Sequence, residues 1–99
     1  YRIRSEATVR ELSAHQAAAL RQLVDKLRRD PDLDEAALVV HVKSLFEGTP
    51  LRPEALFPVI YDLLIARPKG PKLTTLLATM GAERALPLLE PSLDDPRGS

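Results

Sequence analysis

The sequence contains no cysteine, which excludes disulfide bonds, thiolate nucleophiles and every metal site that depends on sulfur. Its two histidines, His15 and His41, lie far apart, and neither is paired with carboxylates at the short spacing of a histidine-based metal site. We therefore expect no metal and no cofactor in this domain.

Long apolar runs and an excess of charge of one sign are also absent. No stretch approaches the roughly twenty apolar residues that a membrane-spanning helix needs, and the start lacks the basic-then-apolar pattern of a signal peptide. The 14 Lys and Arg residues are balanced by 14 Asp and Glu residues, so any nucleic-acid binding would depend on a local patch. These features predict a cytoplasmic domain without membrane contact.

No catalytic constellation is evident. The serines and threonines lie in helix caps, helix starts or the tail, without a GxSxG turn or an adjacent base that could activate a nucleophile. The acidic pairs Asp34-Glu35 and Asp94-Asp95 are neighbours in sequence, so their carboxylates do not face one another as catalytic pairs must. The domain is predicted to be non-catalytic, and its function to be binding or scaffolding.

What is present is the apolar periodicity of an all-α protein, and we predict a compact bundle of about five helices. The 99 residues suffice for one domain, which we assign to residues 13–93. Residues 1–12 are an N-terminal segment for which strand, loop and early helix all remain open, and residues 94–99 are predicted to be a disordered tail. Because the chain begins at Tyr1, we expect it to be part of a longer protein with other domains.

Capping and breaking residues give approximate bounds for the predicted helices: 13–29, 34–48, 53–65, 73–80 and 82–90. Ser13 with Gln16 makes a capping-box pattern at the first start. Asp34 is expected to cap the second helix and Gly48 to end it. Pro58 lies inside the third, which predicts either a kink or a helix that starts closer to Pro58.

The third predicted helix is apolar around most of its circumference, which is typical of a central helix surrounded by others. Its apolar residues are Leu56, Phe57, Ile60, Tyr61, Leu63, Leu64 and Ile65. We interpret them, aromatic rings included, as core residues. His41, between two valines of the second helix, is interpreted as a partly buried, hydrogen-bonded imidazole.

The segment Arg67-Pro68-Lys69-Gly70-Pro71-Lys72 contains three cations and no acid. If Pro71 starts the next helix, the free amides and dipole of that helix would attract phosphate. The alternative is a tight interhelical turn, in which Gly70 adopts backbone angles closed to other residues and Pro71 fixes the first helical position. A second basic cluster, interrupted by acids, is interpreted as a solvated helix face; it comprises Arg21, Arg28 and Arg29.

Part of the sequence resembles the end of class I lysyl-tRNA synthetases. The resemblance is carried by Leu56-Phe57, Ile60-Tyr61, Leu63-Leu64-Ile65, Lys69-Gly70-Pro71-Lys72-Leu73 and Leu76-Leu77. The terminus of glutamyl-tRNA synthetases is similar to Gly70-Pro71, Met80-Gly81 and Glu83-Arg84-Ala85-Leu86. The resemblance implies a helical bundle that receives the anticodon arm of tRNA, with adenylation in a separate domain.

Three functional hypotheses follow. In the first, the domain binds the anticodon arm of tRNA through Arg67, Lys69, Gly70 and Lys72. In the second, it is a helical protein-interaction or regulatory module that kept the fold without RNA binding. The third, a helix-turn-helix DNA reader using residues 73–80, is disfavoured because that helix carries threonines and almost no side chain suited to reading base edges.

Overall fold

Five α-helices make up the chain in a computed structural model, which describes residues 3–93; no strand occurs within that range. The helices are α1 (Ala14–Arg29), α2 (Glu35–Ser44), α3 (Pro53–Ile65), α4 (Leu73–Met80) and α5 (Ala82–Leu93). The predicted all-α bundle is confirmed. The predicted tail, residues 94–99, lies outside the described residues.

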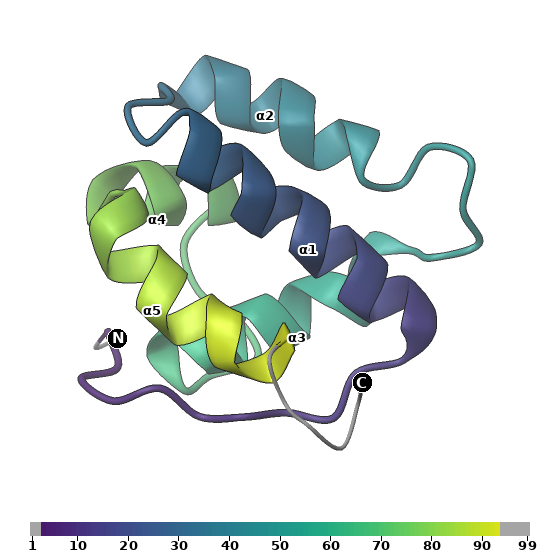
Figure 1. Ribbon diagram of the computed structural model, residues 1–99, viewed down its shortest axis with the longest axis horizontal. Coiled ribbons are helices and arrows are strands. Elements are labelled where there is room, and N and C mark those ends of the chain that lie inside the picture. The colour runs from purple at the N-terminus through teal and green to yellow at the C-terminus, as the bar shows by residue number, and fades with distance from the viewer. Residues whose placement is uncertain (1–2, 94–99) are drawn as a thin grey trace.

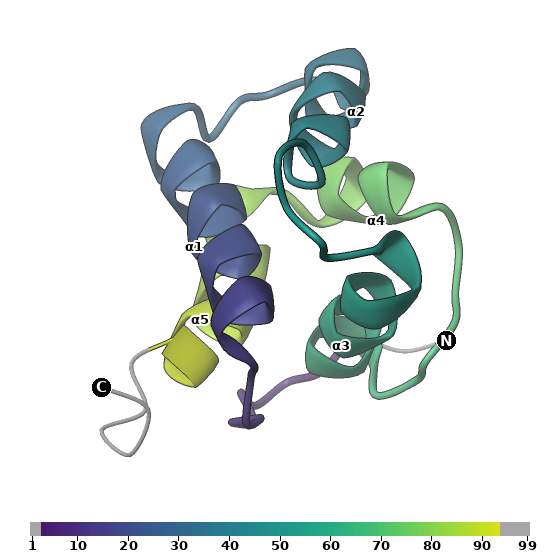
Figure 2. The same cartoon turned by 90° about the vertical axis from the view of Figure 1, so that its right-hand side faces the viewer.

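The helices enclose a single core. α5 packs against α1, α3 and α4, while α2 packs against α4. Figure 1 shows α1 and α2 at the top of the molecule and α3 at the bottom. After a quarter turn, α1 and α5 lie on one side, and α2, α4 and α3 follow the other (Figure 2). The α3–α4 connection is therefore an outer edge of the bundle.

The burial predicted for the third helix is confirmed, but the helix that packs against most of the others is α5 and not α3. The buried residues of α3 are Leu56, Val59, Ile60, Tyr61, Leu63, Leu64 and Ile65. Phe57 departs from the prediction, because it is only half-buried and its ring meets Phe46 edge-on with centroids 5.7 Å apart. The helix begins at Pro53 and continues through Pro58, so the alternative of a start closer to Pro58 is wrong.

Side-chain caps explain where α1 and α2 begin. Ser13 Oγ accepts a hydrogen bond from the Gln16 amide, and Gln16 Oε1 accepts one from the Ser13 amide, at 3.2 and 2.9 Å. Asp34 Oδ1 accepts from the Ala37 amide at 2.8 Å, as expected for the cap of α2.

The predicted end of the second helix at Gly48 is wrong. α2 ends at Ser44, and residues 45–47 continue as tight turns in which each amide bonds to the carbonyl three positions earlier. Gly48 then adopts a φ of 69° and redirects the chain. The last helix is longer than predicted. α5 continues to Leu93, three residues past the predicted end, with Pro87 and Pro91 inside it.

Residues 3–12, which we call the strap, form neither helix nor strand. In Figure 1 the strap is the purple chain that runs below the helices. Its Arg4 amide donates to the Leu64 carbonyl of α3 at 2.8 Å, and its Arg10 amide donates to Ser92 Oγ of α5 at 3.0 Å. The strap therefore contacts both α3 and α5. Of the strand, loop and early helix left open for this segment, the structure shows a loop.

Candidate nucleic-acid interface

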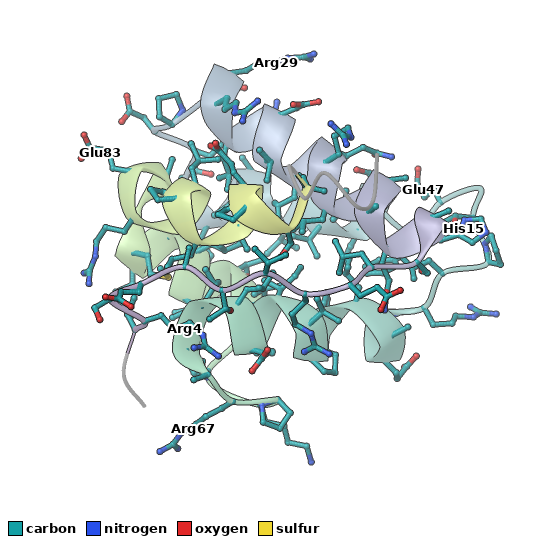
Figure 3. All side chains as sticks on the ribbon, turned by 60° about the horizontal axis from the view of Figure 1, so that its bottom comes forward. Arg4, His15, Arg29, Glu47, Arg67 and Glu83 are labelled. Carbon is teal, nitrogen blue, oxygen red and sulfur yellow. The ribbon has the colours of Figure 1, made fainter. Side chains whose placement is uncertain are left out.

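The basic segment, residues 66–72, connects α3 to α4 at the outer edge of the bundle. The side chains of Arg67, Lys69 and Lys72 are exposed, and none of them forms an ion pair with another described residue. Figure 3 shows Arg67 projecting away from the body of the molecule. Three cations that lack acidic neighbours in sequence and ion-pair partners in space are therefore available to an anion.

The backbone role predicted for Gly70 is wrong. Positive φ angles occur at Gly48, Gly81 and Ala66 among the described residues, and not at Gly70. A Cβ atom at Gly70 would lie 2.6 Å from Ile65 Cδ1 and 3.5 Å from Tyr61 Cδ1. Glycine is needed here because the segment passes directly over the end of α3, and the left-handed residue that turns the chain is Ala66 instead.

Pro71 also lies elsewhere than predicted. The N-cap of α4 is Lys72 and its first residue is Leu73, so Pro71 precedes the helix and does not occupy its first position. The Pro71 carbonyl accepts a hydrogen bond from the Tyr61 hydroxyl. Burial raises the pKa of Tyr61, so this hydroxyl stays protonated as a donor at neutral pH. The basic segment is thus held against α3 near its end.

A Gly70→Ala variant is expected to unfold with a free energy about 1–3 kcal/mol lower than the wild type, because the new methyl group must displace the buried Ile65 side chain. Urea denaturation measures this difference. Lys69→Ala is the matched control, since Lys69 is exposed and its loss is expected to change stability by less than about 0.5 kcal/mol. Equal stability of the two variants would show that Gly70 has no packing role.

Next to Lys72 lies a pocket that the sequence analysis missed. Its volume is about 260 Å³, and it is lined by Val39, Val42, Lys43, Phe46, Pro53, Phe57, Lys72, Leu73 and Thr74. The lining is almost wholly apolar, so Lys43 from α2 and Lys72 from the basic segment contribute mainly the aliphatic parts of their side chains to it. Thr74 is 5% exposed, and its hydroxyl has no hydrogen-bond partner among the described residues. The pocket therefore extends the candidate interface from the basic segment to α2.

A sequence signal for this pocket did exist. Val39, Val42, Lys43 and Phe46 follow the i, i+3, i+4, i+7 spacing that places residues on one helix face. A lysine within an apolar row indicates a face at the edge of the core rather than inside it. Phe57 was interpreted as a core residue, whereas the structure leaves both Phe57 and Phe46 half-buried.

The remaining candidates behave as packing or surface residues. His41 Nε2 lies 3.2 Å from the Gln22 carbonyl of α1, which confirms a half-buried, hydrogen-bonded imidazole. In the second basic cluster, Arg28 pairs with Glu90 at 3.0 Å and lies 4.0 Å from Asp25. In α4, Thr74 is buried and Thr75 half-buried, while Thr79 is exposed, so most of this helix packs against the core.

The free energy of unfolding is expected to decrease at acidic pH because the pKa of His41 is lowered in the folded state. Burial, the largest cause, lowers its pKa below 6.5; the Gln22 carbonyl opposes this, and Lys26 lowers the pKa further. The unfolded chain therefore binds the proton more readily, and the stability that His41 contributes is lost as pH falls through about 6.5 toward the lower folded value. Urea denaturation at several pH values should show a steeper decline for the wild type than for His41→Gln, and parallel declines would contradict this.

Neither a metal cluster nor a membrane span is found in the part of the chain that the structure describes. No three His, Asp or Glu side chains in residues 3–93 converge as metal ligands would. No helix in the same range is both long and apolar enough to cross a bilayer.

The structure thus places an exposed basic segment and an apolar pocket side by side on an all-α bundle. No protein-family model matches the chain, and no solved structure matches it. The chain is 28% identical over 97 residues to the lysine–tRNA ligase of Methanopyrus kandleri, a match that covers 95% of this chain. It spans only 17% of the length of that relative. Nearly all of this chain is thus similar to one part of an aminoacyl-tRNA synthetase.

Proposed function

We propose that this domain binds tRNA at the unpaired loop of the anticodon arm, as the non-catalytic RNA-binding part of a class I aminoacyl-tRNA synthetase or of a protein derived from one, with the lysyl type favoured. The observation that carries the proposal is that the acid-free basic segment, whose three cations are exposed and form no ion pair among the described residues, reaches an apolar pocket at Lys72, where Lys43 also lines it. The similarity to part of a lysine–tRNA ligase supports tRNA as the ligand.

The chemistry of the site favours unpaired RNA over duplex RNA. Lys and Arg contacts to phosphates supply affinity without sequence information, and they give a strong dependence on salt. The bases of a loop are splayed out and are recognised by apolar and aromatic side chains, whereas duplex bases are stacked and out of reach. The pocket would meet both requirements, since Phe46 and Phe57 offer apolar walls, while Lys43 and Lys72 line it with their stems and are exposed enough to extend their ammonium groups to the phosphates of a bound strand.

The alternative, a protein-interaction module, loses one of its two supports. It rested on charge neutrality, which stands, and on the apolar circumference of residues 56–65, most of which is buried in the domain's own core. Among the described residues, the exposed large hydrophobic side chains are Val9, at 49%, and Val40, at 70%, which lie on separate elements. An extended apolar face for a protein partner is therefore not formed by α3.

A comparison of two RNAs tests the proposal. Fluorescence anisotropy would follow binding of an anticodon stem-loop and of a blunt duplex with the same number of phosphates. We expect the stem-loop to bind at least about tenfold more tightly, because only its bases can enter the pocket. Equal affinities would contradict loop recognition and leave a non-specific polyanion surface.

A further inference from the structure

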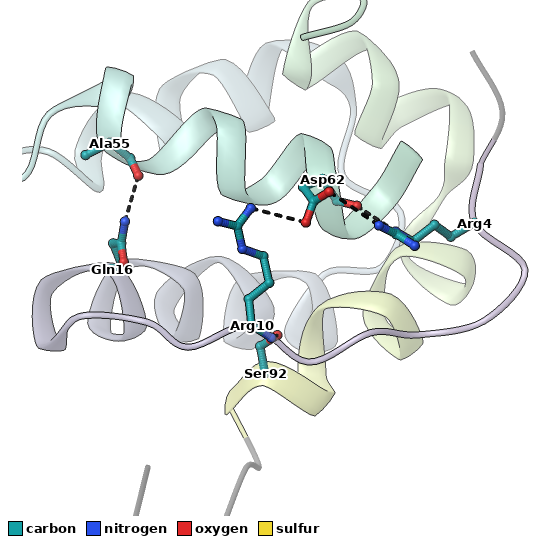
Figure 4. Close-up of polar contacts among 6 residues, drawn as sticks. All are labelled: Arg4, Arg10, Gln16, Ala55, Asp62 and Ser92. Atoms are coloured by element: carbon teal, nitrogen blue, oxygen red, sulfur yellow. Dashed lines mark hydrogen bonds and ion pairs between the residues drawn. The ribbon is translucent and has the colours of Figure 1, made fainter. Parts of the chain in front are cut away.

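The strap caps the C-terminal end of α3, which is the end from which the basic segment departs. Arg4 makes this contact twice, as its amide donates to the Leu64 carbonyl at 2.8 Å and its Nε donates to the Asp62 carbonyl at 2.6 Å. The Asp62 carbonyl also accepts from the Ala66 amide at 3.0 Å, the bond that turns the chain out of the helix. Figure 4 shows the Arg4 guanidinium at this helix end.

The end of α3 needs such a contact for two reasons. The last carbonyls of a helix have no partner within the helix, and they carry the negative end of its dipole. The last turn of α3 contains no basic residue of its own. Arg4 supplies both the donors and the positive charge from 58 residues earlier in the chain.

Arg10 provides a natural comparison. Its Nη1 lies 3.1 Å from Asp62 Oδ2, and Arg4 Nη2 lies 3.3 Å from Asp62 Oδ1, so both arginines pair with the same carboxylate. Only Arg4 also donates to the backbone carbonyls at the helix end. Its side chain is 24% exposed and that of Arg10 is 42% exposed. Substitution of either side chain removes one charge and one ion pair, but only at Arg4 does it also remove the side-chain donor to the Asp62 carbonyl, while the bond from the Arg4 amide to Leu64 remains.

We propose that Arg4 is a positioning residue for the RNA interface: by capping α3 it fixes the turn at Ala66 and hence the direction of the basic segment. This inference rests on the proposed function. Ala66 has a φ of 60°, a left-handed conformation that costs a non-glycine residue energy and persists only when its surroundings hold it. Arg4 and Arg67 line one cavity of about 570 Å³ between the strap and this turn, so the strap lies directly against the start of the segment.

Arg4→Gln and Arg10→Gln form the matched pair that tests the inference. Hydrogen exchange in residues 66–72 would be measured without RNA, with the Ala66 amide, which donates to the Asp62 carbonyl, as the protected reporter, and tRNA affinity would be measured by fluorescence anisotropy. We expect Arg4→Gln to accelerate exchange of the Ala66 amide at least about tenfold and to weaken tRNA binding at least about threefold more than Arg10→Gln does. Equal changes in both variants would overturn the inference, because they would reflect charge alone.

Arg4→Lys is a second variant that keeps the inference testable if Arg4→Gln does not fold. It keeps the positive charge and the backbone donor but loses the planar fork that reaches the Asp62 carbonyl. We expect its exchange in residues 66–72, and its tRNA affinity, to lie between those of the wild type and Arg4→Gln. Faster exchange with wild-type tRNA affinity would overturn the positioning role.

The two proposals fail in different ways. If the wild-type domain does not bind tRNA at all, the proposed function is contradicted and Arg4 is reduced to a helix cap, which the exchange data report independently. If the wild type binds tRNA and Arg4→Gln binds it as Arg10→Gln does, the function stands and the inference is wrong.

Discussion

A Leu64→Ala variant is expected to unfold with a free energy about 2–5 kcal/mol lower than that of the wild type. Leu64 is 0% exposed and lies in α3, which contributes seven buried residues to the core. The substitution removes buried apolar surface and leaves a cavity that the neighbouring helices can only partly fill. A domain of this size has a thin core, so the loss would be a large fraction of its total stability.

Urea denaturation followed by circular dichroism measures the effect. Val40→Ala is the control, because Val40 is 70% exposed on α2 and its truncation is expected to change the free energy of unfolding by less than about 0.5 kcal/mol. A Leu64→Ala variant within about 1 kcal/mol of the wild type would contradict the place of α3 in the core.

Removal of both pocket cations, in a Lys43→Ala, Lys72→Ala variant, is expected to weaken binding of an anticodon stem-loop at least about tenfold. Both side chains line the apolar pocket, one from α2 and one from the basic segment, so they would hold the phosphates on either side of an inserted base. For single-stranded RNA, each lost phosphate contact should also reduce the slope of log affinity against log salt by about 0.7.

The matched control removes two positive charges elsewhere. Arg21 and Arg29 are exposed on α1, away from the pocket, and an Arg21→Ala, Arg29→Ala variant has the same net charge as the test variant. It should bind the stem-loop within about threefold of the wild type, since long-range charge effects are screened at physiological salt. Similar losses for the two double variants would mean that net charge, and not the pocket, determines affinity.

The parts of the fold that sequence reasoning predicted well are those set by local interactions. The capping box of Ser13 and Gln16 and the Asp34 cap involve residues three positions apart, so they are readable from the sequence. The apolar circumference of residues 56–65 similarly predicted the buried helix α3. Each of these features depends on the chain near the residues themselves.

The features that were missed depend on contacts between distant residues. The strap could not be predicted because Arg4 finds its partners on α3, 58 positions away, and nothing local indicates which carbonyls it will meet. The backbone role predicted for Gly70 was wrong because the constraint on this position also comes from the tertiary fold: it is the side chain of Ile65 and not the backbone angle of the glycine. The pocket likewise requires α2, α3 and the start of α4 to be placed together.

Only part of the candidate site could be predicted from the sequence. Arg67, Lys69 and Lys72 were predicted from an acid-free run, and the structure leaves all three exposed without ion pairs among the described residues. Lys43 was not selected, because on α2 it stands alone in sequence and joins Lys72 only through the packing of α2 against α4. Their role in RNA binding stays a prediction.

The central claim is that the basic segment binds tRNA, and a fluorescence-anisotropy titration against unfractionated tRNA at low and at physiological salt tests it most directly. We expect binding that weakens steeply with salt and that is weaker still in a Lys69→Ala, Lys72→Ala variant, because both changes remove phosphate contacts. No binding at either salt concentration, or binding that the double variant leaves unchanged, would contradict the account.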